Sequence, residues 1–284
     1  MDKRGFEQKV NVAIRTCVLV GWTVCAAADH VFAIPVPEPE PSWDDDDEIE
    51  GVRWEYRIYD LQKEDCPCEI LACKNKEEVT GALTIPHSIK GHPVRWIHDW
   101  ALRGCSNLTS VVIQTGVTDI GDEVFGCCRS LTSVSISASV TNIGQHVFYE
   151  CDSLMSIDVN EDNRFYASVD GMLLTKDGKT LIAGINGDVT IPSGVTRIGD
   201  SAFDFYYGLT SVSIPSSVTS IGNSAFRRCD GLTSVTIPAG VTSVETYAFF
   251  SCKSLKSISI PSSVTDFGTS VFSYTDGIVD ATVP

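Results

Sequence analysis

The stretch VTSIGNSAFRRCDGLTSVTIP, residues 218–238, is the clearest copy of a block that recurs along the last two thirds of the chain. Aligning the copies places a leucine at Leu108, Leu131, Leu154, Leu209, Leu232 and Leu255. The intervals are 23 residues, apart from one of 55 that equals one repeat plus 32 additional residues. A unit this short cannot bury its apolar face alone, so consecutive units must stack on one another. The repeat therefore predicts a solenoid.

Each unit contains two extended segments. In the clearest copy, Leu232, Val235 and Ile237 share one face of the first segment, and Pro238 ends it because proline cannot donate to a strand ladder. A period of 20 to 29 residues is typical of leucine-rich repeats. We predict a repeat solenoid of the leucine-rich-repeat type over residues 82–284, rich in β-strand, with short helical turns and about 23 residues per coil.

Two further columns of the repeat are expected in the core. A phenylalanine recurs at matching places and predicts an aromatic spine of Phe125, Phe148, Phe203, Phe226, Phe249 and Phe272. A cysteine lies three residues before the repeat leucine at Cys105, Cys128, Cys151, Cys229 and Cys252. The spacing of adjacent coils suits a disulfide, but parallel side chains make its torsion awkward. We therefore favour buried thiols over disulfides.

The long interval after Leu154 interrupts the regular array. Residues 172–174 and 181–183 are apolar runs on either side of a turn that contains Asp177 and Gly178. An Asp-Gly pair between apolar runs indicates a β-hairpin. We interpret residues 160–190 as one atypical hairpin coil of the array rather than as a second domain.

The first 81 residues lie outside the repeat pattern. Basic residues precede an uncharged run over residues 16–28, which is the outline of a secretory signal peptide at 1–28; the alternative is an amphipathic cytosolic leader. Residues 29–50 are rich in acids and proline, which is typical of an extended linker. Trp54, Tyr56 and Ile58 alternate with charged residues, so residues 51–81 are expected to form a β-hairpin that caps the array.

The charge of the chain excludes two classes of partner. The formal charge is −16, and removal of residues 1–28, with four basic and two acidic side chains, would change it to −18. Nucleic acids and anionic lipids are bound through clustered Lys and Arg, so neither is expected. No apolar run reaches the roughly 20 residues of a spanning helix, so no membrane insertion of the mature chain is expected.

The repeat units at residues 218–238 and 241–261, VTSVETYAFFSCKSLKSISIP, resemble those of the BspA-like leucine-rich repeat surface proteins. The coil YASVDGMLLTKDGKTLIAG and the leading ALTIPHSIKGHPVRWI also resemble variant units of that family, and the resemblance covers residues 82–284. It implies a secreted or cell-surface, non-enzymatic protein that attaches to host proteins or to other cells. It implies no catalytic residues and no cofactor.

Three clusters were considered as sites of chemistry. Residues 44–47 are four consecutive aspartates, Cys66, Cys68 and Cys73 lie close together, and His87, His92 and His98 lie in the first long loop. None has the ligand spacing of a calcium or zinc site, and the histidines are interpreted as solvated. No nucleophile, P-loop or dinucleotide motif is present. The sequence therefore predicts no metal site and no enzyme.

The repeat places polar residues in outward columns. One strand position gives Ser110, Ser133, Ser156, Ser211, Ser234 and Ser257, and the next outward position gives Val112, Ser135, Asp158, Ser213, Thr236 and Ser259. A threonine column, Thr118, Thr141, Thr196, Thr219, Thr242 and Thr265, is expected on the opposite face. Short hydroxyl residues also suit strands and solubility without any ligand.

Two functions fit these columns. We predict an adhesion or protein-interaction module that binds extracellular or host proteins, or glycans, through an extended Ser/Thr-rich face. The alternative is a structural surface protein whose regular Ser/Thr array binds a periodic substrate. The last coil has no recognisable cap, and an open strand edge favours end-to-end self-association.

Overall fold

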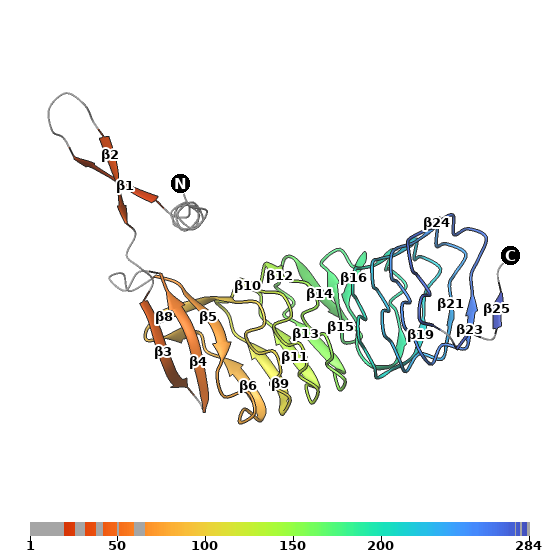
Figure 1. Ribbon diagram of the computed structural model, residues 1–284, viewed down its shortest axis with the longest axis horizontal. Coiled ribbons are helices and arrows are strands. Elements are labelled where there is room, and N and C mark those ends of the chain that lie inside the picture. Colours follow the sequence, from red (N-terminus) through yellow and green to blue (C-terminus); the bar gives the residue numbers. More distant parts are fainter. Residues whose placement is uncertain are drawn as a thin grey trace, which may run out of the picture.

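The computed structural model describes residues 20–25, 32–37, 42–49, 51–59, 66–275, 277–278 and 280–282, and the chain forms an elongated β-solenoid (Figure 1). Most of the predicted signal peptide lies outside the described residues; strand β1 (Val20–Cys25) pairs antiparallel with β2 (Phe32–Pro37). No helix occurs in the described ranges, so the predicted short helical turns are wrong. The coil corners contain residues with positive φ, such as Ser224 at 53° and Arg228 at 56°, which interrupt any helical run.

An antiparallel sheet covers the first coil. Strand β4 (Val52–Ile58) pairs with β3 (Ser42–Ile49) on one side and with β5 (Cys68–Cys73) on the other. The prediction of a linker was wrong for β3. Gly51, with φ of 80°, turns the chain so that the backbone of β3 pairs with β4, and this pairing does not depend on the acidic side chains. Strand β5 then pairs in parallel with β8, which joins this sheet to the array.

One side of the solenoid, here called the strand face, carries the first segment of each coil. Its parallel strands are β6 (Gly81–Ile85), β9 (Leu108–Ile113), β11 (Ser133–Ile136), β13 (Ser156–Val159), β17 (Gly187–Thr190), β19 (Leu209–Ser213), β21 (Ser234–Thr236), β23 (Ser257–Ser259) and β25 (Asp280–Thr282). They form three sheets, β6 to β13, β17 with β19, and β21 to β25. The leucines of the repeat are fully buried beneath them.

The opposite face carries the second segment of each coil, in two sheets. The first sheet continues from β5 through β8 (His92–Ile97), which also pairs with β7 (Ser88–Ile89), to β10 (Asp119–Ile120) and β12 (Asn142–Ile143). The second contains β14 (Tyr166–Val169), β15 (Met172–Thr175), β16 (Thr180–Ala183), β18 (Arg197–Ile198), β20 (Ser220–Ile221), β22 (Ser243–Val244) and β24 (Asp266–Phe267). The opposite face is therefore interrupted between β12 and β14.

The interruption is the atypical coil. Strands β15 and β16 are antiparallel, as the Asp177-Gly178 turn predicts, and Leu174 pairs with Leu181. Strand β14, which the sequence pattern does not reveal, pairs antiparallel with β15 through a turn at Asp170 and Gly171. The hairpin therefore separates two coils that would otherwise be neighbours.

The predicted aromatic spine is present in two parts. Phe203 and Phe226 stack with centroids 5.0 Å apart, and Phe226 and Phe249 stack at 5.1 Å. Phe125 and Phe148 stack at 5.8 Å on the other side of the hairpin. Since each ring packs on its counterpart in the next coil, the phenylalanines connect the coils along the axis.

The column cysteines are free and buried. The Cys229 thiol donates to the Phe203 carbonyl at 3.1 Å, and the Cys252 thiol donates to the Phe226 carbonyl at 3.0 Å. In the last coil, Thr275 takes the same position and its hydroxyl donates to the Phe249 carbonyl at 2.8 Å. The column therefore supplies a hydrogen-bond donor in the core rather than disulfides.

Thiol labelling tests this assignment at two adjacent residues. Burial raises the pKa of Cys128 to about 12, whereas Cys127 is only half-buried. At pH 8 only about one in 10,000 Cys128 thiols would then be ionised. We expect a maleimide to modify Cys127 and not Cys128 in the folded chain, as read by tandem mass spectrometry, and both after denaturation. Rapid labelling of Cys128 in the folded chain would contradict the buried position.

The Ile-Gly pair of each unit marks a close approach between coils. A Cβ added to Gly222 would lie 2.8 Å from the Asp200 nitrogen and 2.9 Å from the Gly199 carbonyl carbon. We expect Gly222→Ala to lower the free energy of unfolding by about 1–3 kcal/mol through overpacking, measured by urea denaturation. The matched control is Gly194→Ala, because the nearest atom to its added Cβ is 3.9 Å away. Equal stability of both variants would refute this packing.

Candidate functional site

The strand face brings most of the predicted binding residues together. Ser110, Ser133 and Ser156 are direct neighbours on β9, β11 and β13. Val112, Ser135 and Asp158 form the adjacent column, and the pairs Ser234–Ser257 and Thr236–Ser259 join β21 to β23. Ser211 and Ser213 on β19 lie beside Asp188 and Thr190 of β17. The columns are thus in register within each sheet but divided among three sheets.

Most side chains of these columns have no hydrogen-bond partner within the described residues. Ser156 donates to Asp158 at 3.0 Å, and Ser211 donates to Asp188 at 2.9 Å. No side-chain hydrogen bond is made in the described part of the chain by Ser110, Ser133, Ser135, Ser213, Ser234, Thr236, Ser257 or Ser259. These hydroxyls point outward from half-buried or exposed positions and can bond to a partner.

The carboxyl ends of β9, β11 and β13 border a shallow hollow of about 550 Å³. Ser135 and Asp158 lie on its floor, and Val112, with 43% of its surface exposed, adds an apolar patch. A hollow that mixes hydroxyls, one carboxylate and exposed aliphatic surface is suited to contact with another macromolecule.

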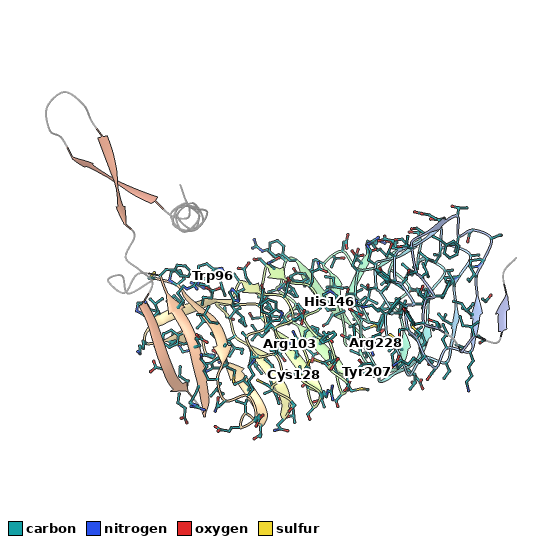
Figure 2. The ribbon with its side chains drawn as sticks, viewed as in Figure 1. Trp96, Arg103, Cys128, His146, Tyr207 and Arg228 are labelled. Atoms are coloured by element: carbon teal, nitrogen blue, oxygen red, sulfur yellow. The ribbon has the colours of Figure 1, made fainter. Side chains whose placement is uncertain are left out.

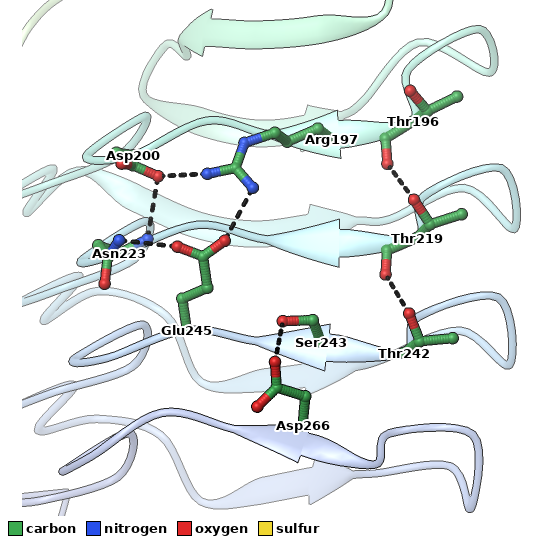
Figure 3. A network of polar contacts seen from close by, with 9 residues as sticks. All are labelled: Thr196, Arg197, Asp200, Thr219, Asn223, Thr242, Ser243, Glu245 and Asp266. Atoms are coloured by element: carbon green, nitrogen blue, oxygen red, sulfur yellow. Dashed lines mark hydrogen bonds and ion pairs between the residues drawn. The ribbon is translucent and has the colours of Figure 1, made fainter.

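The threonines of the opposite face are arranged differently. Thr219 donates through its hydroxyl to the Thr196 carbonyl at 3.0 Å, and Thr242 donates to the Thr219 carbonyl at 3.3 Å (Figure 3). Thr118, Thr141 and Thr196 make the corresponding bonds. These hydroxyls bond successive coils together, so the regular threonine column is explained by coil packing and needs no ligand.

A charged network lies beside the threonine ladder. Arg197 contacts Asp200 at 2.6 Å and Glu245 at 2.8 Å, and Glu245 accepts a hydrogen bond from Asn223 at 2.7 Å (Figure 3). Hydrogen bonding to Glu245 raises the pKa of Arg197 above its ordinary value, so the guanidinium stays charged. The network joins the coils of β18, β20 and β22.

A surface that sequence reasoning missed lies at the coil corner after the phenylalanine spine. We call it the arginine–aromatic edge, and it consists of Arg103, Tyr149, Phe205, Tyr207, Arg227, Arg228, Tyr247, Phe250 and Tyr274. Tyr149 meets Phe205 with centroids 4.5 Å apart, and the guanidiniums of Arg227 and Arg228 lie 4.8 and 4.9 Å from the Phe205 ring centroid. Arg103 and Arg228 lie in the central part of the solenoid (Figure 2).

This edge was missed because its residue types change from unit to unit. A signal was nevertheless present in the two positions that follow each phenylalanine, where aromatic and arginine residues recur. The 55-residue interval also places Tyr149 and Asp204 at equivalent positions of units that become neighbours around the hairpin. Cation–π contacts of this kind stabilise the corner, and Tyr247 and Tyr274 of the edge have exposed rings.

A buried carboxylate lies beneath the edge. Asp204 is 1% exposed and is held by Arg227 in two contacts, Nε to Oδ1 at 2.7 Å and Nη2 to Oδ2 at 2.6 Å. His146 Nδ1 contacts Asp204 Oδ2 at 2.9 Å, and its Nε2 lies 3.4 Å from Ser201 Oγ. His146 and Asp204 are 58 residues apart in the sequence, and the hairpin coil between them lets them meet in space.

The order Ser201, His146, Asp204 is that of a catalytic triad, but the surroundings favour a binding role. The backbone N–H groups of Ser201, Ala202 and Phe203 donate to Asn223, Gly199 and Ala225, so they are not available to stabilise an oxyanion. Asp204 is already neutralised by Arg227, which weakens its effect on the imidazole. The cluster is therefore a polar wall with fixed donors.

The other clusters considered in the sequence are dispersed. His92 is buried and its Nδ1 lies 3.2 Å from the Cys66 carbonyl, so the prediction of a solvated residue was wrong for it; His87 and His98 are exposed. Strand β8 packs His92 against the segment before β5. Among the residues described, no group of three His, Cys, Asp or Glu side chains could hold a metal ion.

No helix in the described ranges is long and apolar enough to cross a membrane. The three cysteines of the cap, Cys66, Cys68 and Cys73, are free and buried.

Comparison with one solved structure shows the same fold, and two more structures are similar over most of the chain. The pneumococcal vaccine antigen PcpA is 16% identical with a TM-score of 0.54, over 83% of this chain and 80% of that one. A leucine-rich repeat protein from Eubacterium ventriosum is 20% identical with a TM-score of 0.47, over 82% of each chain. The T. pallidum leucine-rich repeat protein is 24% identical with a TM-score of 0.44, over 79% of this chain and 87% of that one.

No curated protein sequence matches the chain. The family model described as a BspA type leucine rich repeat region matches six copies, over residues 80–168 and 186–284. Residues 169–185, which the match leaves out, contain β15 and β16, the strands of the atypical hairpin. The chain belongs to the BspA-type leucine-rich repeat family.

Proposed function

We propose that the protein is a secreted or cell-surface interaction module that binds an extracellular or host protein, or a glycan, through its strand face. The observation that carries the proposal is the contrast between the two faces. Most hydroxyls of the strand-face columns have no partner within the described residues, whereas most threonine hydroxyls of the opposite face bond the coils together. A surface with free donors and acceptors is suited to recognition.

Two further features support this assignment. The net charge of −16 favours partners other than nucleic acid and anionic membranes. The solenoid offers a long surface rather than one deep pocket on the strand face, and repeat proteins commonly use such surfaces to contact macromolecules. The proposed role is non-enzymatic and needs no cofactor.

The alternative of a structural protein that binds a periodic substrate has weaker support. It requires long, evenly spaced hydroxyl columns, but the strand-face columns are divided among three sheets and the threonine hydroxyls are used in coil packing. End-to-end self-association through the last coil stays a separate prediction, testable by light scattering across a concentration series.

The proposal is tested by binding of the full chain to arrays of extracellular-matrix proteins, mucins and glycans. The paired variant Ser135→Glu with Thr236→Glu adds one negative charge at each of two exposed strand-face positions, and Ser262→Glu adds one negative charge at an exposed turn. We expect selective binding that falls at least tenfold in the paired variant and is unchanged in Ser262→Glu. Binding that the paired variant retains in full would exclude the strand face.

A further inference from the structure

The gap that the hairpin opens between two coils is a cavity. Its volume is about 260 Å³, and it lies between the coil of β12 and the coil of β18. Leu173, Ile182 and Ala183 of the hairpin line it, together with Gln145 of the β12 coil and with Ser201 and Tyr206 of the β18 coil. The cavity is separate from the strand face and uses none of its residues.

Tyr206 gives this cavity an unexplained feature. It takes the position that cysteines occupy in the neighbouring units, is 3% exposed, and its hydroxyl has no hydrogen-bond partner among the residues that the structure describes. Burial raises the pKa of the Tyr206 hydroxyl well above its ordinary value, so the group stays protonated and can donate. A buried hydroxyl without a partner lowers the stability of the free protein, and an occupant of the cavity could supply the missing acceptor.

The charged groups of the wall are already paired. Asp204 is paired with Arg227 and contacts His146, and Arg197 is paired with both Asp200 and Glu245. An anionic ligand would therefore find no unpaired cation in this wall. The hydrogen-bonding groups of the lining that take no part in ion pairs are neutral hydroxyls and amides, which favours a neutral ligand with several hydroxyls.

The size and the neighbouring surface indicate the class of ligand. A cavity of 260 Å³ is smaller than the roughly 300–1,000 Å³ of sites for drug-sized molecules, and it suits a single ring. The lining combines aliphatic side chains with hydroxyl and amide groups, which matches the apolar face and the hydroxyl rim of a sugar. His146 and Tyr149 also line a second hollow of about 200 Å³ that continues along the arginine–aromatic edge to Phe205. His146 lies in the middle of the solenoid (Figure 2). It lines the same hollow as Arg103 of this edge.

We propose that this cavity binds the terminal residue of a neutral oligosaccharide, with the Tyr206 hydroxyl as hydrogen-bond donor, the Ser201 hydroxyl as a second hydrogen-bonding group, and the next sugar residue against the half-buried ring of Tyr149. His146 is a positioning residue, because Asp204 fixes its ring and directs Nε2 toward Ser201. Aromatic rings next to a polar pocket are suited to the apolar faces of sugars. The proposal stands independently of the strand-face function.

The test uses saturation-transfer NMR and calorimetry on the full chain with neutral disaccharides that contain glucose, galactose, mannose or N-acetylglucosamine, and with sialyllactose as the charged probe. We expect saturation transfer to at least one neutral disaccharide and affinity about tenfold weaker in Tyr206→Phe, since the variant loses one hydrogen bond. Ser201→Ala is expected to weaken the same ligand. Tyr247→Phe is the control, because Tyr247 is an exposed tyrosine of the edge outside the cavity.

A stability measurement separates ligand binding from a structural role of the hydroxyl. If the Tyr206 hydroxyl has no partner in the free chain, Tyr206→Phe will have an unchanged or higher melting temperature. A lower melting temperature would show that the hydroxyl has a structural partner and would overturn the proposal. It would also be overturned by no binding of any neutral disaccharide to the folded chain, by binding of sialyllactose alone, or by unchanged affinity in Tyr206→Phe.

Discussion

Replacing Phe226 by alanine is expected to lower the free energy of unfolding by about 3–5 kcal/mol. Phe226 is fully buried and stacks at 5.0 Å on Phe203 and at 5.1 Å on Phe249, so its removal leaves a cavity in the middle of the spine. Neighbouring coils cannot close this cavity without losing the strand ladders on both faces. Urea denaturation of Phe226→Ala against the unmodified chain measures the effect.

The loss should also be local. A solenoid is stabilised by contacts between neighbouring units, so amide hydrogen exchange is expected to accelerate in residues 218–250 before the cap at 51–81 is affected. Tyr274→Ala is the control, because that aromatic ring is 69% exposed. An unfolding midpoint for Phe226→Ala that equals that of the control would contradict the role of the spine.

Replacing Arg227 by methionine is expected to cost about 3–5 kcal/mol, because it leaves the buried Asp204 carboxylate without its main counter-charge. Arg227 is the larger contributor since both of its contacts to Asp204 are at 2.7 Å or less, whereas His146 supplies one contact at 2.9 Å. Methionine keeps much of the arginine stem, so the loss reports on the guanidinium. Thermal and urea unfolding measure it.

A double variant, Arg227→Met combined with Asp204→Leu, tests whether this loss comes from the unpaired charge. Replacing both members of a buried ion pair by apolar residues is often neutral, so the double variant should recover most of the stability that the single variant loses. If the double variant is as unstable as Arg227→Met alone, packing of the arginine rather than pairing of charge holds this corner together.

The repeat made the array predictable because each core residue recurs at one period. Phe226 and Cys229 were placed in the core from spacing alone, and Ser135 and Thr236 were placed outward for the same reason. The aromatic spine and the buried thiols follow from positions that every coil shares. The binding function of the outward columns stays a prediction.

The unpredicted features are those that do not repeat. Strand β3 was missed because a run of acids is typical of solvated chain, although a backbone ladder depends little on side-chain type. The Asp204 cluster joins His146 and Arg227 from coils on either side of the hairpin, and no single unit contains that pattern. Short helical turns were expected from the family type, but positive φ values at the corners prevent them.

The central claim is that the strand-face hydroxyls serve a partner whereas those of the opposite face serve the fold. Thr236 and Thr219 are both exposed, but only Thr219 donates to a neighbouring coil. The most direct measurement is the unfolding free energy of Thr236→Val beside that of Thr219→Val. We predict no loss for Thr236→Val and a loss of about 0.5–1.5 kcal/mol for Thr219→Val. An equal or larger loss for Thr236→Val would mean that the strand-face hydroxyls are structural, and would contradict the account.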